Sequence, residues 1–483
     1  MAITIAVEPQ DWQSAYNEVV TILTSTKYTE PKFNYIVQIY VDGVYSSKLK
    51  VSPNPSNYGV VNLSKHIEPY LSSDINLSDS NIFKQIPNSY TKYSLVLKEE
   101  YVKTMGFLAV TDDGGFAEYD TTAYGAHPFV VGDIVTVTIT VGGGTYDGEQ
   151  EITAVNSTTS FTTTEVFTAT EIGEAVLSSG ATSITDDAAV FSGDKFALNN
   201  VVDWIDYNTF DNTDYEVETV TPALFLTNLE SSQSVLLDDN INFNIYNKNT
   251  DDAYYLEVIS TLGTIRIENS FRTTSDASKF LSIGVAPTDI LNHSGSVITT
   301  VSGASTVIDS TIDSYTVQLL DGAFAATSEL FTFKVKSECK PYENYKLIYL
   351  NRAGSFSDFN FELGSSKKVD VKRKNYSKNY GEVTVLDATP QSYGWATSDR
   401  GTSVYASLEL ETYSITSDYL KEAEGNKIWD LIRSPEVYHL TDVGVLRAIN
   451  IIDSSKSLKT RLQDKLINYN ISFNYATKNS TQR

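Results

Sequence analysis

The sequence predicts a mainly β protein built of several antiparallel sandwich or barrel domains, with a few short helices. Val, Ile, Thr and Tyr recur at alternating spacing along most of the chain, and strongly helical stretches are few. The chain has 483 residues, which is too long for a single hydrophobic core, and we expect about three domains. Its end, residues 407–475, has the pattern of a β-domain that carries one amphipathic helix.

The first domain is expected to be β-rich, to span residues 1–102 and to continue over about 181–285. An alternating stretch precedes Asp42-Gly43, which is a two-residue hairpin signal, and a return strand follows over 44–51. A further strand is expected over 90–102. Alternation of this kind predicts strands with one buried face and one wet face.

Residues 103–180 differ in amino-acid composition from the residues that precede them. They are rich in Thr, Gly, Ala and Ser and nearly free of Lys and Arg, and segments 127–139 and 152–161 have turn and strand signals. We interpret them as a small β-barrel or sandwich inserted into a loop of the first domain, because exposed loops with close ends tolerate insertions. Residues 286–340 form a second Ser/Thr/Val-rich stretch, which we expect to be an irregular β-rich excursion.

The last domain is expected to span residues 341–483. A strand over 407–415 leads into a helix over 417–433, which Ser417 begins as the N-cap and Pro435 ends. Three strands follow, and the final one alternates polar and apolar residues at every position. The helix presents one apolar side, formed by Leu420, Ala423, Ile428, Leu431 and Ile432.

Charge separates one short segment from the rest of the chain. The net charge is −25, which disfavours general nucleic-acid binding because displacing phosphate counterions needs basic surface. One basic cluster stands out, and it has two interpretations. It is either a solvated strand face with Val369 and Val371 turned inward, or a contact with an acidic neighbour such as another copy of this chain. The cluster consists of Lys367, Lys368, Lys372, Arg373, Lys374 and Lys378.

No catalytic, cofactor-binding or metal-binding motif emerges, so we expect a protein that is not an enzyme. The sequence lacks a phosphate-binding Gly-rich loop, a Gly-x-Ser-x-Gly nucleophile elbow and a His-Glu-x-x-His zinc motif. Its adjacent acidic pairs lack the frame of a calcium loop. Two carboxylates on separate strands could still cut a polysaccharide. The four histidines lie apart, at His66, His127, His293 and His439.

The cysteine content and the N-terminal residues indicate the cellular compartment in which the protein folds. Cys339 is the only cysteine, so no internal disulfide is possible. The first residues lack the basic and apolar segments of a signal peptide, and no run reaches the length of a membrane span. We therefore expect synthesis and folding in a cytoplasm, without membrane insertion.

Two regions together resemble a known group of proteins. The first comprises Trp12–Asn17, Phe33–Gly43, Leu49–Pro55 and Tyr58–Leu63. The second comprises Tyr345–Gly354, the lysine cluster, Leu431–Val437 and the final strand. They resemble virion structural proteins of tailed phages that infect Bacteroidetes-type bacteria, crAss-like phages among them. The likeness covers about half of the chain, and the middle is outside it.

The resemblance implies a virion component that is assembled in the host cytoplasm. It implies a place in the tail, neck or baseplate, and a symmetric ring of copies in contact with other tail or neck proteins. A β-domain backed by one helix is similar to tail-tube, tail-hub and distal-tail proteins, in which phage DNA passes through a channel without specific binding. The alternative is a receptor- or glycan-binding adhesin, as a fibre or head decoration, with residues 103–180 as the binding module.

Overall fold

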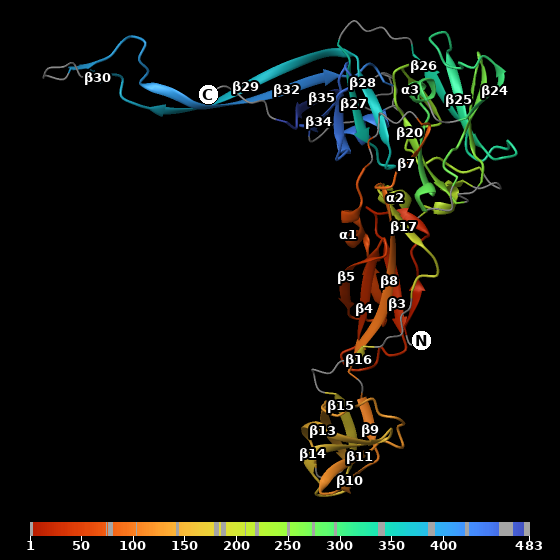
Figure 1. The fold of residues 1–483 in the computed structure, drawn as a ribbon, viewed down its shortest axis with the longest axis vertical. Helices are drawn as coiled ribbons and strands as arrows, with labels where there is room; N and C mark the ends of the chain where they lie inside the picture. The colour runs from red at the N-terminus through yellow and green to blue at the C-terminus, as the bar shows by residue number, and fades with distance from the viewer. Residues whose placement is uncertain are drawn as a thin grey trace. The chain divides into compact units, whose positions relative to one another are not determined.

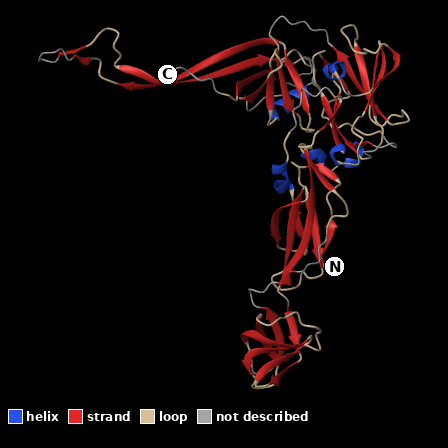
Figure 2. Ribbon diagram, in the orientation of Figure 1, coloured by secondary structure: helices blue, strands red, loops and turns tan. Residues whose placement is uncertain are grey.

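The computed structural model confirms the predicted fold class: antiparallel sheets dominate, and the helices are few and short (Figures 1 and 2). It describes residues 3–73, 75, 81–102, 104–141, 144–177, 183–184, 190–207, 209–217, 222–248, 252–272, 276–293, 297–336, 343–384, 392–420, 425–453 and 467–477. Cys339 lies outside these ranges. Among the described residues, no helix has the length and apolarity needed to cross a membrane. The chain forms two compact units, Met1–Ser72 with Asn88–Asn212, and Ser73–Pro87 with Thr213–Arg483.

The first unit begins with two small sheets around one core. One sheet has the order β1-β3-β6, and the other has the order β2-β17-β8-β4-β5 with β16 paired to β8. The hairpin at Asp42-Gly43 forms as predicted, because both residues adopt the positive φ that such a turn needs. Tyr35, Val37 and Leu95 are fully buried between the sheets. The strands are β1 (Ile3–Val7), β2 (Trp12–Ser14), β3 (Val20–Ser25), β4 (Asn34–Val41), β5 (Val44–Val51), β6 (Gly59–Asn62), β8 (Tyr90–Tyr101), β16 (Ser183–Ile184) and β17 (Lys195–Leu198), and the short helices are α1 (Ser64–Ile67) and α2 (Trp204–Tyr207).

Residues 104–177 form a sheet and a core of their own, and we call them the insert. The strand order is β10-β11-β14-β13-β12-β15-β9. The Val110 amide donates to the carbonyl of Glu171, which curls the sheet toward closure. Tyr119 stacks on Phe161 in the middle of the core. The strands are β9 (Thr104–Phe107), β10 (Ala109–Asp113), β11 (Phe116–Asp120), β12 (Ile134–Val141), β13 (Gly148–Ser157), β14 (Ser160–Val166) and β15 (Ile172–Leu177).

The insert is expected to fold when it is produced alone. The insert begins after Tyr101, at the end of β8, and Ser183, which follows the insert, pairs with Tyr101. The two ends of the insert therefore lie side by side. Its core draws on residues 102–161 and on no strand of the surrounding sheets. A fragment of residues 102–180 should give a cooperative thermal transition and dispersed amide signals in NMR. A fragment without a cooperative transition would show that the core needs the rest of the chain.

The second unit contains two sheets that share one large core. Their orders are β18-β20-β23-β7 and β19-β26-β25-β21-β22-β24. Two features differ from the expected organisation. Residues 73–87 and 213–285 belong to this unit and not to the first, and the strands at 298–303 and 314–320 pair with 263–268 and 255–260 instead of forming an excursion. The strands are β7 (Phe83–Gln85), β18 (Glu216–Val217), β19 (Ser232–Val235), β20 (Asn242–Asn247), β21 (Tyr255–Ser260), β22 (Gly263–Glu268), β23 (Phe280–Gly284), β24 (Ile298–Gly303), β25 (Ser314–Leu320) and β26 (Phe331–Val335), with helix α3 at Pro287–Asn292.

The chain ends in a seven-stranded sheet of order β28-β27-β33-β34-β35-β32-β29. Helix α4 covers it with Ile428 and Leu431, and it begins at Gly425 rather than at the expected Ser417. The Ser417 side chain caps no helix, because its Oγ accepts the Tyr469 amide at 2.9 Å. Residues 417–420 therefore run extended beside 467–469. The elements are β27 (Tyr345–Leu350), β28 (Phe356–Phe361), β29 (Leu363–Ser377), β32 (Thr402–Thr416), α4 (Gly425–Arg433), β33 (Val437–Leu440), β34 (Leu446–Ile451) and β35 (Asn470–Tyr475), and a two-stranded sheet comprises β30 (Glu382–Thr384) and β31 (Ser392–Gly394).

Asparagines join this sheet to β20. Asn242 Nδ2 donates to the carbonyl of Phe356, and Asn244 Nδ2 donates to that of Ala353. The backbone of Asn240 donates to Asp358 Oδ2 at 2.6 Å. Three alternate residues of one segment thus hold the second sheet by polar contacts. The alternating asparagines over 240–244 therefore contact the neighbouring sheet and do not form a solvent-exposed strand face.

A buried charge cluster lies beside these asparagines. Lys346 Nζ is 2.9 Å from Asp358 Oδ2 and also donates to the carbonyl of Asp238. Asp239 Oδ2 accepts the Leu236 amide, and its Oδ1 accepts Asn360 Nδ2. Burial, with Asp358 nearby, raises the pKa of Asp239 to about 7. Because these carboxylates are buried, we assign them to stability and not to chemistry on a substrate.

Replacing Asp239 by Asn should remove a pH dependence of stability. The folded state holds the proton of Asp239 up to about pH 7, whereas the unfolded chain releases it near 3.8. Stability from this group is therefore full below pH 4 and falls as the pH rises toward 7. Asp239→Asn should match the parent near pH 4 and exceed it at pH 8 by on the order of 2–4 kcal/mol. Urea unfolding of both proteins at the two pH values tests this, and equal differences at both would contradict it.

Candidate assembly surface

Strands β29 and β32 form a long two-stranded ribbon. They pair antiparallel from Leu363 with Thr416 to Ser377 with Thr402. Strand β32 also pairs with β35, but only over Tyr413–Thr416. The rest of the ribbon runs on beyond the sheet with no third strand among the described residues (Figure 1). An isolated two-stranded ribbon is marginally stable in water, which indicates a partner surface.

Both faces of the ribbon expose apolar side chains. Val369 and Val371 lie opposite Glu411 and Glu409 on one face, which we call the valine face. Asp370, Lys372 and Lys374 lie opposite Leu410, Leu408 and Ala406 on the other, the leucine face. Exposed fractions are 45% for Val369, 43% for Val371, 50% for Leu408 and 42% for Leu410. The expectation that the two valines turn inward is therefore corrected: the ribbon has left the sheet, and no layer covers either face in the described part of the chain.

Five of the six residues of the predicted basic cluster lie on β29, Lys378 follows directly after it, and all six are exposed. Lys367 pairs with Glu411 at 2.6 Å, and Lys368 pairs with Asp370 at 2.9 Å. The other four have no anionic partner among the described residues. They are Lys372, Arg373, Lys374 and Lys378. In a chain of net charge −25 this is a local surplus of positive charge, which favours contact with an acidic surface.

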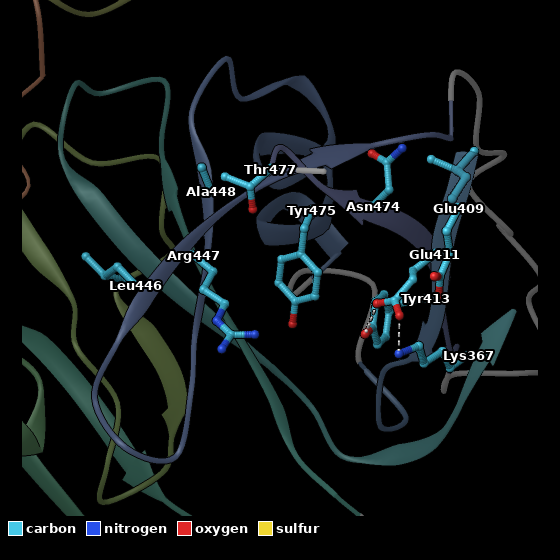
Figure 3. A pocket seen from close by; sticks show the side chains of 11 residues that line it. Lys367, Glu409, Glu411, Tyr413, Leu446, Arg447, Ala448, Asn474, Tyr475 and Thr477 are labelled. Carbon is cyan, nitrogen blue, oxygen red and sulfur yellow. Dashed lines mark hydrogen bonds and ion pairs between the residues drawn. The ribbon is translucent and has the colours of Figure 1, made fainter. Parts of the chain in front are cut away.

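A hollow of about 640 Å³ opens at the base of the ribbon, where β32 and β35 diverge beyond Tyr413 and Phe473 (Figure 3). Lys367, Glu411 and Tyr413 form one wall, and Arg447 and Tyr475 form the other. Tyr413 stacks on Phe473 with ring centroids 5.2 Å apart and an interplanar angle of 11°. The base of the ribbon is thus fixed by aromatic packing against β35.

The polar groups of the hollow orient one another. The Tyr413 hydroxyl donates to Glu411 Oε2 at 2.9 Å. A hydrogen bond from Lys367 lowers the pKa of Glu411, and the same bond raises the pKa of Lys367.

On the opposite wall, the Arg447 guanidinium lies 5.5 Å from the Tyr475 ring centroid, and the Tyr475 hydroxyl is 2.8 Å from His439 Nδ1. Burial and the nearby Arg447 lower the pKa of His439, which favours the neutral ring at pH 7. Burial raises the pKa of both tyrosines, which stay protonated. The arrangement is suited to holding a polar partner segment by hydrogen bonds.

The sequence indicated the cations but not the residues around them. The Leu-Glu alternation over 408–411 has the pattern of a half-buried strand, and nothing in it tells whether a second layer covers the leucines. Arg447 and Tyr475 join the hollow through pairing of β34 with β35, which is a long-range feature. His66 lies on α1, His127 lies in the loop before β12, and His293 directly follows α3; none of the three lines the hollow. Within the described ranges, no group of three His, Cys, Asp or Glu side chains could hold a metal ion.

Comparisons with known proteins found little. No protein-family model matches the chain, and a search of curated proteins gave no match. Among solved structures, a phage phi92 endosialidase is 12% identical with a TM-score of 0.15, over 100% of this chain and 70% of that one. SGBP-B of the Bacteroides ovatus mixed-linkage glucan utilization locus, solved in complex with a mixed-linkage heptasaccharide, is 11% identical with a TM-score of 0.14, over 84% of this chain and 92% of that one. Latent PorU of Porphyromonas gingivalis is 9% identical with a TM-score of 0.12, over 70% and 34%. Such scores are too low to relate the folds.

Proposed function

We propose that this chain is a non-enzymatic structural protein of a tailed-phage virion that assembles with copies of itself into a ring of the tail, neck or baseplate. The phage assignment rests on the resemblance of the two terminal regions. The assembly role rests on the ribbon, whose outer part presents leucines, valines and unpaired cations with no layer of the described chain over them. Exposed apolar surface rimmed by charge is typical of protein contact sites.

The ribbon is the single observation that carries the proposal. Its leucine face offers Leu408 and Leu410, both about half exposed, for burial by a partner. The ribbon carries more unpaired cations than anions, whereas the chain as a whole is acidic, with 36 Lys and Arg against 61 Asp and Glu. A second copy therefore supplies the acidic surface that the ribbon needs. The many like charges elsewhere would otherwise keep copies apart.

The test replaces both leucines by serine. Losing the burial of both leucines costs about 2 kcal/mol for each interface between two copies, which corresponds to roughly 30-fold weaker association. Sedimentation velocity should show the parent as an oligomer and Leu408→Ser/Leu410→Ser shifted toward monomer. The matched control is Val443→Ser, an 83% exposed valine in the turn between β33 and β34. Equal sedimentation of parent and double variant would remove the ribbon from assembly.

A second candidate function is a receptor- or glycan-binding adhesin that uses the insert. The observation in its favour is that the insert has its own core and exposes aromatic side chains at Phe116 and Tyr124. This candidate requires that virions without the insert lose adsorption to host cells. Adsorption at the parental rate after deletion would exclude it.

A further inference from the structure

We propose that the insert of one copy is the surface that receives the ribbon of the next copy. This inference rests on the proposed self-assembly and adds the identity of the receiving surface. The reason is charge. Residues 104–177 carry eleven of the chain's 61 acidic residues and none of its 36 lysines and arginines. No other segment of this length offers so complete a complement to a basic ribbon.

Three of the eleven acidic side chains, those of Glu149, Glu151 and Glu174, lie on one outer face of the insert. Glu149 and Glu151 of β13 are exposed, while Gln150 between them is buried and points inward. Glu151 lies opposite Ile134 of β12, and Glu174 of β15 lies opposite Thr138. Cross-strand neighbours share a face, so Glu149 and Glu151 lie beside Ile134, which is 46% exposed, and Glu174 lies on the same face further along β12.

The two surfaces match in spacing as well as in charge. Lys372 and Lys374 lie two residues apart on β29, and Glu149 and Glu151 lie two residues apart on β13. Such pairs repeat at about 7 Å along a strand, so both lysines can meet both glutamates at once. Leu408, opposite Lys372, would then meet the apolar centre of the acidic face. Burial of Leu408 on Ile134 adds an apolar contact to the ion pairs.

A nucleic-acid backbone is the less suitable partner for this ribbon. Phosphates would pair with Lys372 and Lys374, but they offer no apolar surface to Leu408 and Leu410. The insert offers both carboxylates and an apolar centre. Because the ribbon and the insert are different surfaces of one chain, their contact is heterologous, and repeated contacts close into a ring when the rotation allows.

Charge exchange tests the inference. The ribbon variant is Lys372→Glu/Lys374→Glu, and the insert variant is Glu149→Lys/Glu151→Lys. Each alone brings like charges together and should weaken self-association by at least about tenfold. A mixture of the two variants should assemble again, because each supplies the charge that the other lacks. The chain with all four changes should also assemble. Lys48→Glu/Lys334→Glu, which changes charge on other exposed strands, should behave as the parent.

Light scattering of the full-length proteins gives the masses, and thermal melts verify that each variant is folded. Loss of assembly in both double variants, with recovery in the mixture, is the expected result. If the parent assembles and the insert variant keeps its mass, the ribbon binds elsewhere and this inference fails while the proposed function stands. Failure of the mixture to recover also overturns it. Tight binding of a short DNA duplex that the ribbon variant loses, with self-association unchanged, would assign the ribbon to nucleic acid. A monomeric parent would overturn the proposed function itself.

Discussion

Replacing Lys346 by methionine is expected to destabilise the second unit by about 3–5 kcal/mol, the usual cost of breaking a buried ion pair. The ammonium is nearly buried and lies 2.9 Å from Asp358. Burial by itself would lower the pKa of Lys346, but Asp358 and Asp239 outweigh it and raise that pKa. Methionine has similar length and no charge, so the variant leaves both carboxylates buried without their cation. Urea unfolding at pH 7, followed by tryptophan fluorescence, measures the change.

The matched control is the double variant Lys346→Met/Asp358→Asn. It neutralises Asp358, the nearer of the two carboxylates, together with the cation, and it should recover a large part of the lost stability, because a neutral buried pair avoids the desolvation cost. The asparagine introduced in place of Asp358 would still accept the Asn240 amide through its side-chain carbonyl oxygen. A single variant that loses less than about 1 kcal/mol would show that water reaches the cluster and that the charges are not buried as described.

Shortening the ribbon is expected to abolish self-association without unfolding the chain. Replacing residues 372–408 by Asn-Gly joins Val371 to Glu409, which already face each other, through a two-residue hairpin. The change removes all four unpaired cations together with Leu408 and leaves the Lys367–Glu411 pair at the base. No described residue of the removed segment belongs to a hydrophobic core. Light scattering should report a monomer, and the thermal transition should move by no more than a few degrees.

A smaller deletion serves as the control. Replacing residues 378–401 by Asn-Gly joins Ser377 to Thr402, which also form a pair, and it keeps Lys372, Lys374 and Leu408 in place. This variant should assemble like the parent. If it dissociates as fully as the larger deletion does, the end of the hairpin and not the body of the ribbon makes the contact.

Local pattern predicted local structure well. Alternation indicated the strands, and Asp42-Gly43 indicated its hairpin, because both signals depend only on neighbouring residues. The start of α4 was misplaced for a related reason. Ser417 has the chemistry of an N-cap, but its Oγ accepts the amide of Tyr469, which lies 52 residues away, and no local rule reveals that contact.

Long-range strand pairing and side-chain burial could not be predicted from the sequence pattern. The Ser/Thr/Val-rich composition of residues 286–340 suggested an irregular excursion. The structure instead pairs β25 with β21 and places Val317 opposite Val258. For the assembly surface, the sequence indicated the six cations and offered contact with an acidic neighbour as one interpretation. It could not tell that Val369 and Val371 are exposed, because alternation is the same in a strand that a layer covers and in one that no layer covers. The sequence showed that the insert is nearly free of Lys and Arg, but the placement of Glu149, Glu151 and Glu174 on one face needed the register of β12, β13 and β15.

The central claim is that the chain assembles with itself through the ribbon, and the mass of the purified full-length protein tests it most directly. Sedimentation velocity at physiological salt, over a range of micromolar concentrations, is the measurement. We predict one dominant species whose mass is an integer multiple of the 53.4 kDa chain. A single species of 53.4 kDa at every concentration would contradict the account.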